Sequence, residues 1–149
     1  MDKIKFKIVT PEKVVYEDEI DSLTLPTKTG EITVLPNHIP LVSTLKAGEL
    51  LIKKGKEEIP MAISGGFVEV AANSLVVLAD TAEKFEDIDE ARAEAGRKRA
   101  EELMTRKDEI AKEEIDYTAL TAKMEKELTR LKVVRKYRKN RNMPDIKNE

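Results

Sequence analysis

A short stretch of charged residues in IDEARAEAGRKRA has the spacing of an anion-binding clamp. Its members follow one another at intervals of three, four and three residues: Asp89, Arg92, Gly96 and Arg99. On an α-helix they share a face, where two guanidinium groups could hold phosphate oxygens by charge-assisted hydrogen bonds. Asp89 could then accept a hydrogen bond from an adenine amino group. The same spacing is also typical of a solvated helix face with weak Asp–Arg pairs, so the residues alone leave both interpretations open.

The single histidine, His38, lies between two prolines in the segment TVLPNHIP. A hydrolase would need a nucleophile and an acid beside it, and Ser43, Asp80 and Glu31 are the conceivable partners. No G-x-S-x-G nucleophile elbow is present, and SGG at 64–66 suits a tight turn equally well. We therefore expect His38 to be a structural or contact residue and not a catalyst.

Composition excludes several kinds of site and partner. The chain has no cysteine and one histidine, which excludes disulfides and the usual Cys/His zinc sites. Without a Walker A loop or a G-x-G-x-x-G stretch, a nucleotide site would lack a phosphate-cradling loop. A net charge of -2, with 38% charged residues of both signs, argues against nucleic-acid binding. No segment approaches the ~20 apolar residues of a membrane span, and no signal peptide is evident, so we expect a soluble intracellular protein without direct membrane insertion.

Residues 1–84 have the period of β structure. KIKFKIV alternates polar and apolar residues, as a half-buried strand does, and further short apolar runs follow at close spacing. PLVSTLKAG is separated from ELLIKKG by Gly48, and EEIPMAIS from GFVEVAAN by the Gly65–Gly66 pair, which predicts separate short strands. Many short strands with turn signals between them indicate an antiparallel sandwich or flattened barrel. The pattern does not encode the strand order.

Residues 85–149 have a helical composition. Between Phe85 and Arg141 there is one glycine and no proline, and strong helix formers dominate. Asp87 and Glu90 predict a capping box at the start of a first helix over 88–106.

A second helix is predicted by an apolar stripe with intervals of three and four residues: Tyr117, Leu120, Met124, Leu128, Leu131 and Val134. The joining segment TRKDEIAKEEID contains no Gly or Pro, so local preference allows one continuous rod of roughly 75 Å at about 1.5 Å per residue. A hairpin would instead bury the stripe against Ala93, Gly96 and Ala100. The two arrangements are evenly matched, which is the condition for a conformational switch, although an ordinary irregular hinge fits as well.

The end of this helix, RLKVVRKYRKNR at 130–141, is basic and contains no acidic residue. Such a run can contact nucleic acid, an anionic membrane or an acidic protein surface. A solvated helix end is an equally ordinary interpretation, because cations are favourable at a helix C-terminus. The run is too short for a nucleic-acid module.

The blocks GEITVLPNHIPLVSTLKAGEL and ISGGFVEVAANSLVVLAD, followed by the helical tail, resemble the epsilon subunit of the bacterial F-type rotary ATP synthase. The resemblance covers essentially the whole chain. It implies an α+β fold, with an antiparallel β-sandwich at 1–84 and a regulatory two-helix hairpin at 85–149. It also implies a subunit without catalytic residues, which couples proton flow through the c-ring and gamma subunit to ATP synthesis on the alpha/beta hexamer. The tail would inhibit ATP hydrolysis when it extends toward the hexamer, where the basic run could meet acidic surfaces.

The resemblance further assigns contact residues and a location. It places the loop at 30–40 at the sandwich end that faces the c-ring and gamma, so that Glu31, His38 and Pro40 become subunit contacts. Proline restricts the backbone and lowers the ordering cost of docking, which suits this role. A peripheral position on the cytoplasmic face of the bacterial plasma membrane is implied.

Some bacterial members of the family bind ATP as a regulatory ligand on the folded hairpin, through an I/L-D-x-x-R-A motif. The positions that correspond to this motif and its flanking ligands are Glu83, Ile88, Asp89, Arg92, Ala93, Arg99 and Lys126. Two arginines expected on the second helix are absent, because Ala122 and Lys126 occupy their positions. Lysine supplies a point charge and alanine none, so we expect weak ATP binding. A free-standing ATP-binding sensor is the alternative outside the family.

Overall fold

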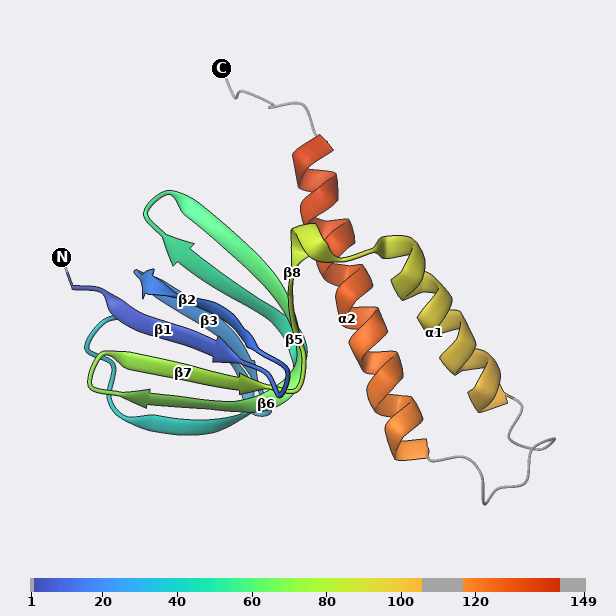
Figure 1. The fold of residues 1–149 in the computed structure, drawn as a ribbon, viewed down its shortest axis with the longest axis horizontal. Coiled ribbons are helices and arrows are strands. Elements are labelled where there is room, and N and C mark those ends of the chain that lie inside the picture. The colour runs from blue at the N-terminus through green and yellow to red at the C-terminus, as the bar shows by residue number, and fades with distance from the viewer. Residues whose placement is uncertain (1, 106–116, 143–149) are drawn as a thin grey trace. The chain divides into compact units, whose positions relative to one another are not determined.

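The computed structural model describes residues 2–105 and 117–142, and the side chains within 2–105 and 118–137. The chain divides into two compact units, Met1–Lys84 and Phe85–Glu149. The first unit consists of strands β1 (Ile4–Val9), β2 (Val14–Ile20), β3 (Ser22–Thr27), β4 (Gly30–Val34), β5 (Leu41–Lys54), β6 (Glu57–Ala71), β7 (Ser74–Ala79) and β8 (Ala82–Lys84) (Figure 1). The second contains a 3-10 turn, η1 (Phe85–Asp87), and two helices, α1 (Glu90–Thr105) and α2 (Tyr117–Asn142).

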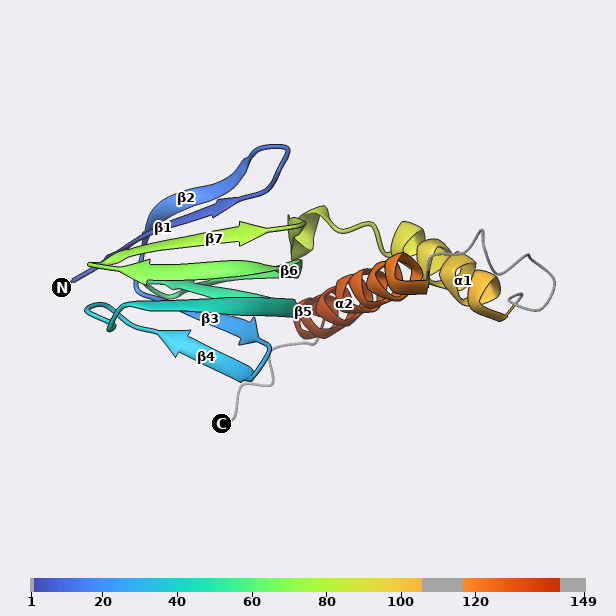
Figure 2. The ribbon, with the colours of Figure 1, turned by 90° about the horizontal axis from the view of Figure 1, so that it is seen from below.

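The strands form the predicted β-sandwich, with the order β2-β1-β7-β6-β5-β3-β4 and β8 paired to β6 (Figure 2). The pairings are antiparallel except that β1 runs parallel to β7. Buried and more exposed residues alternate along β1 and β7, so the apolar phase of KIKFKIV supplies core side chains. Ile4, Phe6 and Ile8 are at most 2% exposed. Burial of such a side chain contributes about 1.5–3 kcal/mol, which explains why the period-two pattern predicts this unit well.

Two long strands replace four of the predicted short ones. Gly48 lies within β5, and Gly65–Gly66 lies within β6, so the strand boundaries predicted at these glycines were wrong. Gly65 and Gly66 have φ angles of 80° and 125°, which bend β6 without ending its pairing with β5. Beyond this bend β6 changes its second partner from β8 to β7.

The two helices pack against one another as a hairpin, and they lie side by side in both views (Figures 1 and 2). This is the hairpin arrangement and not the continuous rod. Part of the predicted first helix, Arg106, and all but the first residue of the joining segment lie outside the described residues. The predicted capping box at Asp87 was wrong, because Asp87 belongs to η1 and the helix begins at Glu90.

Small residues of α1 meet the apolar face of α2. Ala93 and Ala100 are at most 1% exposed, and Leu131 and Val134 at most 2%. Leu128, predicted in the stripe, is 47% exposed instead. The neighbouring Glu127 occupies the interface at 6% exposure, one position along the helix from the predicted residue.

A glycine makes room for this buried carboxylate. A Cβ on Gly96 would lie 3.0 Å from Cδ of Glu127, so the absence of a side chain at Gly96 leaves space for it. Arg130 compensates the charge, with Nη1 3.0 Å from Oε2 of Glu127. A buried charge is tolerated only when it is paired in this way, which hydrophobic periodicity alone does not reveal.

Candidate functional site

The predicted I-D-x-x-R-A motif forms the N-terminus of α1. Asp89 is the N-cap, because its Oδ1 accepts a hydrogen bond from the backbone N–H of Arg92 at 3.1 Å. Ile88 is buried at 3% exposure, and its N–H donates to the carbonyl of Phe85 at 3.3 Å. Ala93 is fully buried against α2 and donates its N–H to the Asp89 carbonyl at 3.0 Å. Ile88, Asp89 and Ala93 therefore shape the helix start, and both Asp89 and Arg92 are exposed to solvent.

Uncompensated cations mark one face of α1, because Arg92 and Arg99 are seven residues apart on this helix. Arg92 and Arg99 of α1 are exposed, and Lys126 of α2 is half-buried. Within the described part of the chain, the side chains of these three residues make neither an ion pair nor a hydrogen bond. Cations of this kind can donate hydrogen bonds to phosphate oxygens without first breaking an internal ion pair.

The remaining predicted positions lie on other elements. Glu83 lies on β8 in the sandwich unit, where it pairs with Ala62 of β6 and is half-buried. Ala122 is exposed on α2 and brings no charge. Within the helical unit, the predicted ligands Asp89, Arg92 and Arg99 therefore come from the start and middle of one helix, and Lys126 comes from the other.

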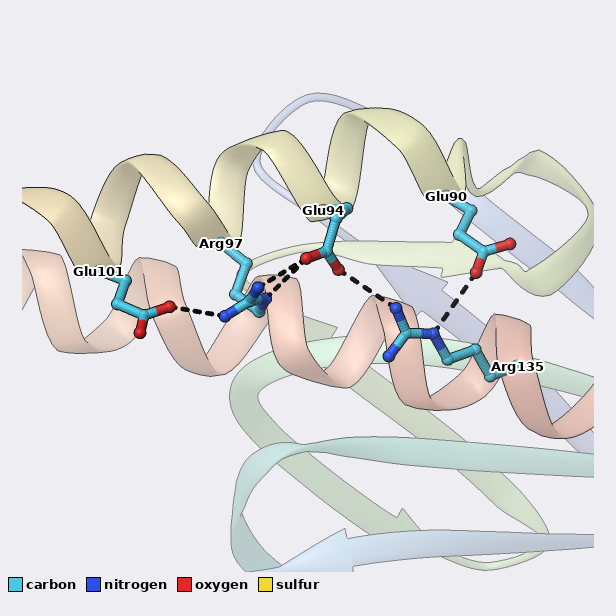
Figure 3. Close-up of polar contacts among 5 residues, drawn as sticks. All are labelled: Glu90, Glu94, Arg97, Glu101 and Arg135. Carbon is cyan, nitrogen blue, oxygen red and sulfur yellow. Dashed lines mark hydrogen bonds and ion pairs between the residues drawn. The ribbon is translucent and has the colours of Figure 1, made fainter.

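Another side of the helix pair carries a chain of ion pairs, drawn in Figure 3. Arg135 of α2 places Nε 3.4 Å from Oε1 of Glu90 and Nη2 3.2 Å from Oε2 of Glu94. Arg97 holds the other oxygen of Glu94 at 2.6 Å and contacts Glu101 at 2.7 Å. The hydrogen bond from Arg97 lowers the pKa of Glu94 below its ordinary value, while desolvation opposes the shift and the charges of Arg97 and Arg135 add to it. The three- and four-residue spacing within α1 could have predicted the Arg97 pairs, but no sequence signal points to Arg135.

A hollow beside the start of α1 contains two predicted ATP ligands among its lining residues: Ile88, Asp89, Glu90, Ala91, Glu94 and Arg135. The guanidinium group of Arg135 is already paired with the carboxylates of Glu90 and Glu94. Two carboxylates beside a triphosphate would repel it, so this hollow does not suit phosphate groups. A phosphate is better accommodated by Arg92 and Arg99.

In the sandwich unit, the loop after β4 has a firmly held backbone. Pro36 and Asn37 form the centre of a tight turn in which the N–H of His38 donates to the carbonyl of Leu35 at 3.2 Å. Asn37 has a φ of 64°, the left-handed conformation that Asn tolerates at this position of a turn. Its N–H donates to Oδ1 of Asn73, between β6 and β7, at 2.8 Å. The loop therefore presents its side chains from a fixed backbone.

The predicted contact residues differ in their surroundings. Glu31, on β4, and Pro40 are exposed, and His38 is half-buried. The Nδ1 atom of His38 lies 2.7 Å from the carbonyl oxygen of Ile39, so the ring bonds within its own loop. No described hydrogen bond links His38 to the conceivable catalytic partners Ser43 and Asp80.

An exposed apolar surface that the sequence analysis did not identify lies on and beside this loop. Ile39 and Val42 are 74% and 71% exposed, and Leu35 is also exposed. Phe67 and Leu78, which pair across β6 and β7, are more than half exposed. Leucine, isoleucine and phenylalanine at such exposure mark a candidate docking surface. The available signal was the presence of apolar residues in both phases of these strands, as in GGFVEV and SLVVLA.

The described residues offer neither a metal site nor a membrane-spanning helix. No group of three or more His, Asp or Glu side chains within 2–105 and 118–137 is placed to hold a metal ion. No helix in the described part of the chain is both long and apolar enough to cross a membrane.

The chain is similar to a known group of proteins along most of its length. The sequence profile "ATP synthase, Delta/Epsilon chain, beta-sandwich domain" matches residues 3–85, and the profile "ATP synthase, Delta/Epsilon chain, long alpha-helix domain" matches residues 86–135. The ATP synthase epsilon chain of Dehalococcoides mccartyi strain BAV1 is 43% identical over 143 residues, which cover 94% of this chain and 98% of that one. The epsilon chain of Desulforamulus reducens is 43% identical over 128 residues, covering 86% and 94%.

A solved structure shares the fold. It is a chain in the cryo-EM structure of the Euglena gracilis mitochondrial ATP synthase, described as OSCP/F1/c-ring in rotational state 1. The TM-score is 0.62 at 19% identity, with 94% of this chain and 82% of that chain covered.

Proposed function

Because this chain belongs to the ATP synthase delta/epsilon chain family, we propose that it acts as a non-catalytic subunit of the central stalk of an F-type ATP synthase. It would couple proton flow through the c-ring and gamma subunit to ATP synthesis on the alpha/beta hexamer, at the cytoplasmic face of the plasma membrane. The observation that carries this proposal is the agreement of both units with the two family profiles in the same order. Association with gamma after co-expression tests it and separates it from a free-standing sensor.

The apolar surface around the 35–42 loop is the proposed docking surface for gamma. It includes the neighbours of the predicted contact residues His38 and Pro40, and hydrogen bonds hold the backbone of this loop, so docking would cost little ordering entropy. We expect a doubly substituted chain, Ile39→Asp and Val42→Asp, to lose co-purification with gamma. Val14→Asp, at a residue of β2 that is 47% exposed, is the control and should retain it. Equal retention by both chains would contradict this assignment.

The helix pair is the proposed regulatory element of the subunit. Its closed form would permit ATP hydrolysis, and an extended form reaching the hexamer would restrain it. Removing residues 85–149 leaves the sandwich core intact, because the core is formed within the first unit. The truncated chain should therefore still assemble, and the assembled complex should hydrolyse ATP faster. Unchanged hydrolysis in an assembled, truncated complex would refute the inhibitory role.

ATP is the proposed ligand of the uncompensated cations Arg92 and Arg99. The support is their lack of internal partners among the described residues, combined with the motif at the start of α1. We expect calorimetric titration of ATP into the full chain to show weak one-to-one binding that Arg92→Ala abolishes. Lys98→Ala, an exposed cation on the same helix, is the matched control. Equal loss of binding in both variants would indicate general charge attraction, and no heat at millimolar ATP would exclude the site.

A further inference from the structure

The ion pairs of Figure 3 differ in whether they depend on the closed helix pair. Arg97 pairs with Glu94 and Glu101 at separations of three and four residues, so these pairs need only α1. Arg135 is 45 and 41 residues away from its partners Glu90 and Glu94. The Arg97 pairs therefore persist in any arrangement that keeps α1 helical, whereas those of Arg135 exist only when α2 lies against α1.

Only an interaction that differs between two states can shift the equilibrium between them. Closing the helix pair gives Glu90 and Glu94 a shared guanidinium, and opening it removes that cation from both. Glu94 is held in place beforehand, because Arg97 binds its other oxygen through two nitrogen atoms, Nε at 3.2 Å and Nη2 at 2.6 Å. A carboxylate that is already ordered loses less side-chain entropy when a second cation binds to it.

We propose that Arg135 is a clasp that favours the closed helix pair over the open one, and that Arg97 positions Glu94 to receive it. The clasp deepens the regulatory role proposed above, since it would set how much of the subunit is available to inhibit hydrolysis. It acts without nucleotide, on a different side of the helix pair from the uncompensated cations. Both partners are partly exposed, with side-chain exposures of 61% for Arg135 and 27% for Glu94, so salt should weaken the clasp.

The test uses distances within the full-length chain. Since the chain has no cysteine, single cysteines introduced at the exposed positions Ala95 and Glu125 can carry spin labels without competing thiols. In the closed form the two helices are neighbours at this level, where Gly96 faces Glu127. In a continuous helix the two positions would be about 45 Å apart, at 1.5 Å per residue, so the two forms give separate distance peaks.

We expect Arg135→Gln to raise the open-to-closed ratio about three- to tenfold, the range for the loss of two partly exposed ion pairs. Raising the salt concentration from about 0.05 to about 0.5 M should produce a similar shift in the unsubstituted chain and little further shift in Arg135→Gln. Lys132→Gln, an exposed cation one turn earlier on α2, is the matched control and should leave the ratio unchanged. Equal shifts in the two variants, or no shift in Arg135→Gln, would overturn the clasp.

A double-mutant cycle distinguishes loss of the ion pairs from a general effect of the substitution on the helix. In a chain that carries Glu90→Gln and Glu94→Gln, Arg135→Gln should have almost no additional effect, because its partners are already neutral. A full additional effect would show that Arg135 acts through packing and would overturn the proposal. Far-UV circular dichroism should show no loss of helix content in any of the variants.

The rate of ATP hydrolysis by the assembled complex tests the proposed inhibitory role independently of the clasp. If both hold, Arg135→Gln lowers ATP hydrolysis as it opens the helix pair. If the distances shift and hydrolysis does not, the clasp stands and the inhibitory role of the open form fails.

Discussion

Gly66 of β6 is the position where a single methyl group should do most damage to the sandwich. Its φ of 125° is one that residues with a side chain rarely adopt. A Cβ there would lie 2.8 Å from Cα of Ala79 and 2.9 Å from the carbonyl carbon of Leu78, and closer still to the Leu78 oxygen. All three atoms belong to the backbone of β7, so no side-chain rotation can relieve the overlap.

The magnitude has two parts. The strained backbone conformation costs about 1–3 kcal/mol for a residue with a side chain. Moving β7 away from Gly66 adds about 1–3 kcal/mol for overpacking and about 1 kcal/mol for each ladder hydrogen bond that is lost. With one ladder hydrogen bond lost, we therefore expect Gly66→Ala to lower the free energy of unfolding by about 3–7 kcal/mol, a large share of the 5–15 kcal/mol typical of a domain.

Gly30→Ala is the control that has the backbone strain without the steric overlap, so the difference between the two variants measures the steric part of the cost. Gly30 has nearly the same φ, 133°, but a Cβ there would meet nothing within 4 Å. Urea unfolding of the full-length chain, followed by circular dichroism, should show Gly30→Ala losing about 1–3 kcal/mol and Gly66→Ala at least about 2 kcal/mol more. If the two variants lose equal stability, the close approach of β6 and β7 is not what requires glycine at this position.

Three further outcomes are expected. Asp89→Ala should lower the stability of the helical unit by about 1 kcal/mol in urea unfolding, and Asp89→Asn by much less, because Asn can also cap the helix. Ala122→Arg should tighten ATP binding about tenfold in calorimetry by restoring a second-helix guanidinium, and an unchanged affinity would contradict the clamp. The hydrogen bond from Lys54 lowers the pKa of Asp18, so this pair stabilises the fold above the unfolded carboxyl pKa of about 3.9 and ceases to do so as the pH falls through the folded value. The difference in thermal midpoint between the unsubstituted chain and Asp18→Asn, measured across a pH series, should accordingly be present at neutral pH and vanish in strong acid.

The sequence was a good guide wherever one local pattern controls the structure. Alternation with period two predicted the sandwich, because one buried phase of each strand is enough to place it. The family resemblance and the two-unit organisation with a helical tail rested on contiguous blocks of sequence, and the family was confirmed by both profiles. The ATP-binding and subunit-contact residues remain predictions, although the structure shows that Asp89 caps a helix and that His38 lies in a fixed loop.

The predictions of strand ends and of the buried face of α2 were partly wrong, because each relied on a rule about neighbouring residues alone. Glycine was read as the end of a strand, but at Gly65–Gly66 it allows a bend while the pairing with β5 continues. A three-to-four-residue period cannot distinguish position 127 from position 128, and Glu127 is buried because Gly96 on another helix leaves space for it.

The amino-acid sequence by itself determined which part of the chain forms strands, which part forms helices, and the motif at the start of α1. Each of these depends on neighbours within a few residues, whereas the bounds of the long strands do not. Only the tertiary structure decided between hairpin and rod, because local preference was equal for both and the packing of Ala93 and Ala100 against α2 decides the balance. It likewise placed Arg135 beside Glu90 and Glu94, more than forty residues away along the chain. Such contacts depend on the register between two helices, and that register is fixed by the whole interface and not by any one segment.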